Sequence, residues 1–309
     1  MNEKSNHSSA VVIWALIMIF SFIACKDPII PEQQLFTVTQ GANLAAKLAW
    51  VKTNAQSNTN YIIEVSADES LAPQTLSYNR KTNIGITITG TSVEPVISLS
   101  SKGSLFRVET GITLTLNNIT LRGLSDNDAS LVNINTGNLV MNAGSRITGN
   151  TKNYRGIQYG GGAVFMFRGT FTMNGGEISG NTANVLDTDW YISCGGGVVM
   201  NGKVTFTMTG GEIFGNTAVG VYSSGGGVVM SNNAYDKASC RISGGVIYGS
   251  NEENESLRNT ADRHAAASLD SYRYVIAEYG TFSGGKWIKT GILTTTDNTI
   301  RVVDGVLVP

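Results

Sequence analysis

The sequence predicts an all-β protein, a right-handed parallel β-helix of about seven to eight coils with a short N-terminal capping helix. Three observations predict this single-stranded β-solenoid: low charge with abundant glycine, internal repeats, and short runs of alternating apolar residues. Of 309 residues, 15 % are charged and 36 are glycine. Sparse charge and frequent Gly, Asn, Ser and Thr fit short strands joined by tight corners better than a helical bundle.

The repeats are visible by direct comparison of segments. GGGAVFMFRGTFTMNGGEISGNTA begins at Gly160, GGGVVMNGKVTFTMTGGEIFGNTA at Gly195, and GGGVVMSNNAYDKASCRISGGVIYGSN at Gly225. Weaker copies begin at Leu114, Leu139 and Gly280. Repeats of this length indicate stacked units, none of which buries its apolar side alone.

Within each copy, apolar residues alternate with polar ones, which is the periodicity of a strand. Phe171 and Met173 are predicted to point inward around an outward Thr172, and Phe206 and Met208 repeat that pattern. A second inward column is predicted from Ile147, Ile178, Ile213, Ile247 and Trp287. Parallel ladders between successive coils would satisfy the backbone groups.

Glycine and asparagine mark the predicted corners. The pairs Gly175–Gly176, Gly210–Gly211 and Gly244–Gly245 permit positive φ where the chain turns. Each of three asparagines follows a glycine and is predicted to stack as an amide ladder continued by Ser250; they are Asn150, Asn181 and Asn216.

One helix is predicted, in the segment Gln40–Ala55. Leu44, Leu48 and Val51 fall at helical spacing, and Asn43 suits the N-cap position. A solenoid needs its open end covered, so this helix is expected to be the N-terminal cap.

The first residues read as an export signal. Residues 1–24 are predicted to be a lipoprotein signal peptide, because the apolar run is short of the ~20 residues that a spanning helix needs. Ala24 precedes a lone Cys25, the predicted lipidation site that would attach the chain to a membrane. Residues 25–36 are expected to be a tether outside the fold, and residues 37–309 the β-helix domain. An uncleaved membrane anchor is the alternative.

Cys194 and Cys240 leave two alternatives open. Export permits a disulfide between them, whereas the repeat alignment makes Cys240 a small buried hydrophobe.

Composition and residue pattern argue against several function classes. A net charge of −1 gives no electrostatic footprint for nucleic acid. His264 is the one histidine beyond the predicted leader, and with no Cys or His partner it supports neither a zinc site nor a nucleophilic triad. No cofactor is predicted. Asp126 and Asp128 are interpreted as turn residues rather than calcium ligands.

An enzyme of the polysaccharide-active kind is the alternative to a non-catalytic protein. Glu177 and Glu212 are predicted to stack on neighbouring coils, near the separation of a retaining glycosidase pair, ~5 Å. Arg146 falls in the same column one coil earlier, so a solvated charge ladder is the preferred interpretation.

The insertions between repeats are predicted to emerge from one corner, which is how solenoids build a binding face. They run over residues 150–160, 181–195, 216–225 and 250–274. Aromatic residues gathered there suit a glycan or a protein surface. The predicted binding residues are Tyr154, Arg155, Tyr159, Asp189, Trp190, Tyr191 and Tyr222.

The order GNTA, variable loop, GGGVV resembles the repeats of chlamydial-type polymorphic outer-membrane proteins. Residues 161–164 match the GGA[ILV] element of those repeats, although the phenylalanine of their F-x-x-N element is absent. The chain also resembles spirochaete surface lipoproteins with a pectate-lyase-like β-helix. The resemblance implies the fold, an outward-facing outer-membrane location and an adhesin-like role toward host or matrix ligands; it supplies no catalytic residue. A purely structural envelope protein is a further alternative.

Overall fold

The computed structural model describes residues 33–155, 160–186, 194–220, 225–231, 238–261, 267–268 and 276–308. These belong to one compact unit, Gln33–Pro309, whereas Met1–Glu32 form a second unit outside the described residues. The described chain is all-β in class, with one α-helix, α1 (Leu44–Asn54), and one short 3₁₀ turn, η1 (Glu255–Leu257).

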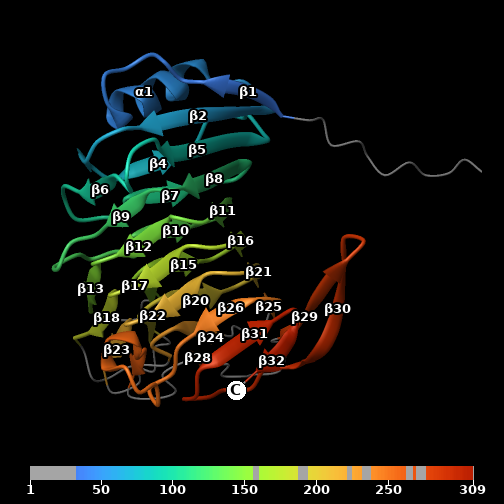
Figure 1. The fold of residues 1–309 in the computed structure, drawn as a ribbon. Coiled ribbons are helices and arrows are strands. Elements are labelled where there is room, and N and C mark those ends of the chain that lie inside the picture. Colours follow the sequence, from blue (N-terminus) through green and yellow to red (C-terminus); the bar gives the residue numbers. More distant parts are fainter. Residues whose placement is uncertain are drawn as a thin grey trace, which may run out of the picture. The chain divides into compact units, whose positions relative to one another are not determined.

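Most strands belong to three long sheets, here named A, B and C (Figure 1). Sheet A contains β1 (Gln34–Thr37), β2 (Thr59–Val65), β5 (Ile84–Gly90), β8 (Ile112–Asn117), β11 (Asn138–Met141), β16 (Gly169–Met173), β21 (Val204–Met208), β25 (Ser239–Ile242), β29 (Ile276–Ser283) and β30 (Lys286–Ile292). Sheet B contains β3 (Glu69–Leu71), β6 (Val96–Leu99), β9 (Thr120–Arg122), β12 (Arg146–Thr148), β17 (Glu177–Ser179), β22 (Glu212–Phe214), β26 (Gly245–Ile247), β31 (Ile300–Val303) and β32 (Val306–Val308). Sheet C contains β4 (Gln74–Leu76), β7 (Phe106–Val108), β10 (Val132–Ile134), β15 (Val164–Met166), β20 (Val198–Asn201), β24 (Val228–Ser231) and β28 (Ala267–Ser268).

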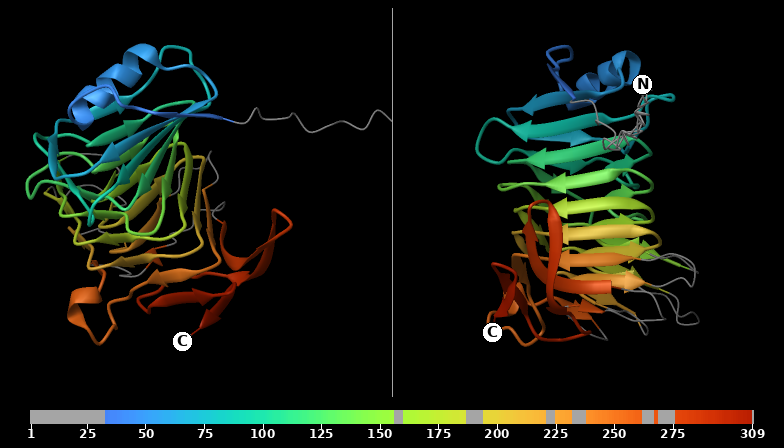
Figure 2. Two further views of the ribbon diagram at one scale, coloured as in Figure 1. Left: turned by 45° about the horizontal axis from the view of Figure 1, so that its top comes forward. Right: turned by 90° about the vertical axis from the view of Figure 1, so that its right-hand side faces the viewer.

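From β2 to β28 the chain visits sheets A, B and C in turn, and each strand pairs in parallel with its counterpart on the next pass. One such pass is called a coil below. The strands therefore stack in sequence order, as both views of Figure 2 show. This parallel-sheet architecture is compatible with the predicted solenoid.

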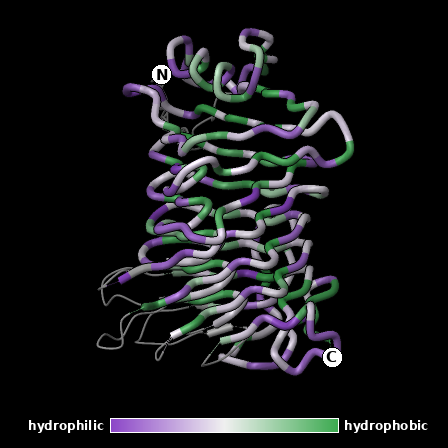
Figure 3. Tube along the Cα trace, turned by 90° about the vertical axis from the view of Figure 1, so that its left-hand side faces the viewer, coloured by the Kyte–Doolittle hydropathy of each residue, from purple (hydrophilic) through white to green (hydrophobic). Residues whose placement is uncertain are grey.

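The core lies between the three sheets and is built from columns of like residues. One column of sheet A runs through Leu114, Leu139, Phe171 and Phe206, all fully buried and in register. The last two rings lie 4.9 Å apart between centroids. Because inward and outward residues alternate, hydrophobic and hydrophilic segments alternate along the trace in Figure 3. At the corners between sheets A and B, Gly176, Gly211 and Gly245 have φ of 84°, 88° and 98°, as the glycine pairs predict.

The helix α1 begins and ends inside the predicted segment. The side chain of Asn43 caps it by accepting a hydrogen bond from the amide of Ala46 at 2.9 Å. Its buried residues are the three that the periodicity predicts, Leu44, Leu48 and Val51. It packs on β2 and β3 at the N-terminal end of the sheets.

Two predictions at the ends of the body are wrong. The expected tether, residues 25–36, overlaps β1, whose Gln34 pairs with Thr59 of β2 and whose Phe36 ring stacks on Trp50 at 5.3 Å. Trp287 does not join the second inward column, because β29 and β30 form an antiparallel hairpin instead of another coil. Ile300 of β31 pairs with Ile247 and takes that place, fully inside the core cluster.

The two cysteines are both buried, and no disulfide joins them. Cys240 lies in the inward column next to Phe206, and burial raises the pKa of its thiol to about 12. The thiol therefore stays protonated and packs as a small hydrophobe.

Candidate functional site

The connection from sheet B to sheet C is the corner at which the chain departs from the three-sheet path. Early coils cross it directly, as from Leu71 to Gln74, whereas later coils take long excursions, as from Thr148 to Val164. Two additional parallel sheets form along these excursions. Sheet D contains β13 (Thr151–Tyr154), β18 (Thr182–Val185), β23 (Thr217–Val219) and β27 (Thr260–Ala261), and sheet E contains β14 (Gly160–Gly161) and β19 (Cys194–Gly195).

A column of buried asparagines connects sheet B to sheet D. The side-chain amide of Asn181 donates to Oδ1 of Asn216 at 3.0 Å, and it also donates to the carbonyls of Ile147 and Ser179 at 3.0 Å. The backbone amide of Asn150 donates to Oδ1 of Asn181 at 3.2 Å. These asparagines are fully buried, so each amide supplies hydrogen bonds to backbone carbonyls at a corner where water does not reach them.

The column continues in both directions beyond the residues that the sequence pattern suggested. Asn127 donates to Oδ1 of Asn150 at 2.9 Å, and Asn216 donates to Oδ1 of Asn259 at 3.1 Å. The predicted continuation by Ser250 is therefore wrong. Asn259 is fully buried and its amide donates to the carbonyls of Ile213 and Tyr248, the same pattern that Asn216 makes one coil earlier. Each asparagine of this column is called a rung below.

The outer face of sheet D carries neutral polar side chains in register. Threonines occupy the same position on paired strands and form a column. The hydroxyl of Thr260 donates to the hydroxyl of Thr217 at 3.0 Å. Beside it, Asn184 donates to Oδ1 of Asn153 at 2.9 Å. Asn153 in turn donates to Asp126, whose other oxygen pairs with Lys102 at 2.8 Å. Asp126, interpreted from the sequence as a turn residue, therefore links Asn153 of sheet D to Lys102 of the second coil.

Of the predicted binding residues, the structure places two on this corner. The backbone of Tyr154 ends β13, and Arg155 follows it with an exposed side chain. The other five lie outside the described residues: Tyr159, Asp189, Trp190, Tyr191 and Tyr222. The predicted lipidation site, Cys25, also lies outside them.

Beneath sheet D lies a buried lysine that sequence reasoning missed. Lys152 is 5 % exposed and its Nζ lies against Gly160 of sheet E. Burial lowers the pKa of its ammonium group to about 8, and the neighbouring Cys194 and Asp128 partly oppose that shift. Cys194 belongs to a small apolar cluster with Ala183 and Ala218. The alternation in TKNY would have identified Lys152 as inward, since it aligns with Ala183 of β18.

The carboxylates considered for catalysis lie on sheet B. Glu177 of β17 and Glu212 of β22 are paired in register, and Arg146 of β12 precedes them in the same column. The guanidinium Nε of Arg146 lies 2.9 Å from Oε2 of Glu177, and both side chains are partly exposed. Among the described residues, no group of three or more His, Cys, Asp and Glu could hold a metal ion.

No family model, no curated protein and no solved structure matches the chain. Within the described part, no helix has the length and apolar character to cross a membrane.

Proposed function

We propose that the chain is an exported, lipid-anchored cell-surface protein whose right-handed parallel β-helix displays a binding surface for a glycan or a protein. The surface is the corner from sheet B to sheet C, including sheet D and the excursions that leave it. Lipidation of Cys25 would hold the chain at the membrane, and the body would face outward from the outer membrane.

The observation that carries the proposal is the restriction of long excursions to one corner over successive coils. The buried asparagines keep the backbone of this corner hydrogen bonded while the chain leaves and returns. Variable segments on a rigid, regular support are the usual way in which folds present recognition residues. The hydroxyl and amide groups of sheet D can both donate and accept hydrogen bonds, as the hydroxyls of a glycan require.

An array of glycans and matrix proteins, probed with the purified full chain, tests the binding role. We expect saturable binding that falls at least tenfold when Trp190 and Tyr191 are both changed to Ala. The same double change on the hairpin, Phe282→Ala with Ile288→Ala, removes exposed apolar area elsewhere and is expected to leave binding unchanged. Equal losses in both variants would show that the corner is not the binding surface.

The anchor is tested separately by cell fractionation. Wild-type chain is expected in the membrane fraction and accessible to protease added to intact cells, whereas Cys25→Ala is expected in the soluble fraction. Retention of Cys25→Ala in the membrane would favour an uncleaved anchor.

The array experiment also tests the alternative that the chain is a polysaccharide-active enzyme. The observation in favour of that alternative is that Glu177 and Glu212 lie in register on neighbouring strands. Released reducing or unsaturated sugar ends that disappear in Glu177→Gln and Glu212→Gln would replace the binding proposal by a catalytic one.

A further inference from the structure

The N-terminal end of sheet C has an open edge. Among the described strands, β4 pairs only with β7, and no strand covers its other side. The ladder to β7 uses the amide of Gln74, which donates to Leu105, and the carbonyl of Leu76, which accepts from Glu109. Because successive residues of a parallel strand face opposite neighbours, the amide and carbonyl of Thr75 point to the uncovered side.

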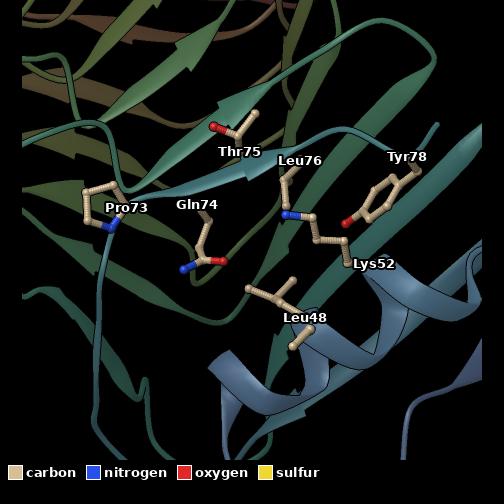
Figure 4. A pocket seen from close by; sticks show the side chains of 8 residues that line it. Leu48, Lys52, Pro73, Gln74, Thr75, Leu76 and Tyr78 are labelled. Carbon is tan, nitrogen blue, oxygen red and sulfur yellow. The ribbon is translucent and has the colours of Figure 1, made fainter.

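A pocket of about 390 Å³ follows this edge, with α1 as its opposite wall (Figure 4). Leu48 and Lys52 reach into it from α1, and Lys52 extends toward Leu76 and Tyr78 on the strand side. The lining is mixed, with Lys52, Gln74, Thr75 and the phenol of Tyr78 beside leucines that are themselves largely buried. An exposed strand edge with space beside it is where an extended peptide can add to a sheet.

The groove continues along the turn after β4 and is cationic there. A second pocket, of about 560 Å³, shares Thr75 and Tyr78 with the first and is also lined by Arg80 and Lys81. Among the described residues, Lys52, Arg80 and Lys81 form no ion pair.

The acidic residue in this wall does not offset those charges. Glu109 is held by Arg107 at 2.6 Å, and it also accepts from Asn135 at 2.9 Å. The groove therefore presents positive charge without a compensating carboxylate of its own.

The turn itself holds Arg80 in an unfavourable backbone conformation. The amide of Lys81 donates to the carbonyl of Tyr78 at 2.8 Å, and the two residues between them, Asn79 and Arg80, have φ of 20° and 60°. Positive φ at both central positions favours Asn and Gly, so an arginine there is strained. Glycine would adopt this conformation without strain, so the fold alone does not require an arginine here. Residues with strained backbone conformations are found preferentially at functional sites.

We propose that this groove binds an extended acidic segment of a partner protein, which adds to β4 as a further strand of sheet C. Side chains of an added strand alternate between its two faces, so the carboxylates that meet Lys52, Arg80 and Lys81 would be separated along the segment by uncharged residues. The site is independent of the corner surface and of the function proposed for it.

The first probe is a fluorescein-labelled, terminally blocked eight-residue peptide of alternating valine and aspartate, titrated into the purified full chain. We expect a saturable rise in anisotropy that weakens as salt is raised, since the cations are exposed. The matched peptide of alternating valine and lysine is expected not to bind.

Two substitutions separate edge pairing from general attraction. Thr75→Pro removes the outward amide donor, which an edge strand tolerates, whereas Thr75→Val keeps it. We expect Thr75→Pro to weaken binding about fivefold, which corresponds to one hydrogen bond of about 1 kcal/mol, and Thr75→Val to bind like wild type.

Arg80→Gly provides a test that loss of folding cannot imitate. Glycine relieves the positive φ, so thermal stability is expected to stay the same or rise, while affinity for the acidic peptide falls about two- to fivefold. Lys203→Ala removes an exposed lysine from a distant turn and is the charge-matched control, expected to change neither.

Equal binding of the aspartate and lysine peptides would overturn the proposal. So would equal affinity of Thr75→Pro and Thr75→Val, since an electrostatic patch that merely attracts polyanions needs no strand edge. Binding by Arg80→Gly at wild-type affinity would remove the charge complementarity on which the choice of partner rests.

Discussion

The early and late coils cross the corner from sheet B to sheet C in different ways. In the first two coils the path from sheet B to sheet C is direct, and Pro73 lies in the first of these turns. The third crossing carries the buried Asn127, and from the fourth coil on each crossing carries a buried asparagine and an excursion with strands of its own. An excursion therefore needs buried side chains to supply the hydrogen bonds that a tight turn makes within its own backbone.

The boundary between the two regions shows the change within one contact. Asn127, the first of the buried asparagines, accepts from the amide of Gly103 at 2.8 Å and donates to its carbonyl at 2.9 Å. It therefore completes the last direct corner on one side and donates to Asn150, the first rung of the excursions, on the other. The apolar core runs through both regions; the late coils add this column to it, whereas the first coil is covered by the helix α1.

Removing one internal asparagine of the column is expected to destabilise the late coils more than any other change considered below. Asn216→Ala removes a buried donor from the carbonyls of Ile178 and Phe214, and Asn181 loses its acceptor. We expect a loss of about 3 kcal/mol in the free energy of unfolding, measured by urea denaturation.

Asn174→Ala is the matched control, because Asn174 belongs to an exposed amide ladder on the outer face of sheet A, with Asn142 at 3.0 Å. Its loss is expected to be within about 0.5 kcal/mol, since water replaces the partner. Similar losses in both variants would show that burial of the column is not what stabilises the late coils.

The last rung gives the next largest effect. Asn259→Ala removes donors to Ile213 and Tyr248 but supports one neighbouring rung instead of two, so we expect a loss of about 2 kcal/mol. Ser250→Ala, at the position that the repeat pattern suggested, is expected to change stability by less than about 0.5 kcal/mol. If thermal or urea unfolding shows a larger loss of stability for Ser250→Ala than for Asn259→Ala, Ser250 and not Asn259 continues the asparagine column.

These two residues also show how far the sequence predicts the corner. The repeat places Ser250 after Tyr248 and Gly249 with the spacing of earlier asparagines, and strand pairing supports that alignment through Ile247. The chain instead inserts η1 and brings Asn259 to the rung. Local spacing could not show this, because a buried amide needs only the right position in space and not a fixed distance along the chain.

The prediction of a further coil at the C-terminal end is wrong for another reason. The segment GTFSGGKWIKTG has the alternation and glycine pair of a coil, but the same pattern also specifies a two-residue hairpin turn. Gly284 and Gly285 have φ of 55° and 74°, and β29 pairs with β30 across them. The inner columns of Phe171 and Phe206, and the helix over Leu44 to Val51, were predictable because periodicity alone determines which side chains are buried.

A smaller effect concerns the lysine beneath sheet D, which the early coils lack. Because its pKa falls from 10.5 to about 8 in the folded chain, the unfolded chain binds more protons between those values. Stability therefore rises with pH through that range, by on the order of 1.5 kcal/mol between pH 8 and 9.5. Lys152→Met is expected to lack this rise in urea titrations, and the exposed Lys203→Met to retain it. Parallel pH profiles for Lys152→Met and wild type would place the ammonium group in solvent.

The smallest expected effect tests whether charges on the outer face contribute to the late coils at all. Glu177→Gln breaks the ion pair with Arg146, but both side chains are partly exposed, so the loss of stability should stay below about 0.5 kcal/mol. Glu212→Gln, one strand further along the same column, is the matched variant and forms no ion pair among the described residues. High salt should reduce the difference between them, because it screens the pair. A loss above about 1 kcal/mol for Glu177→Gln alone would mean that the outer column shares the role assigned here to the buried asparagines.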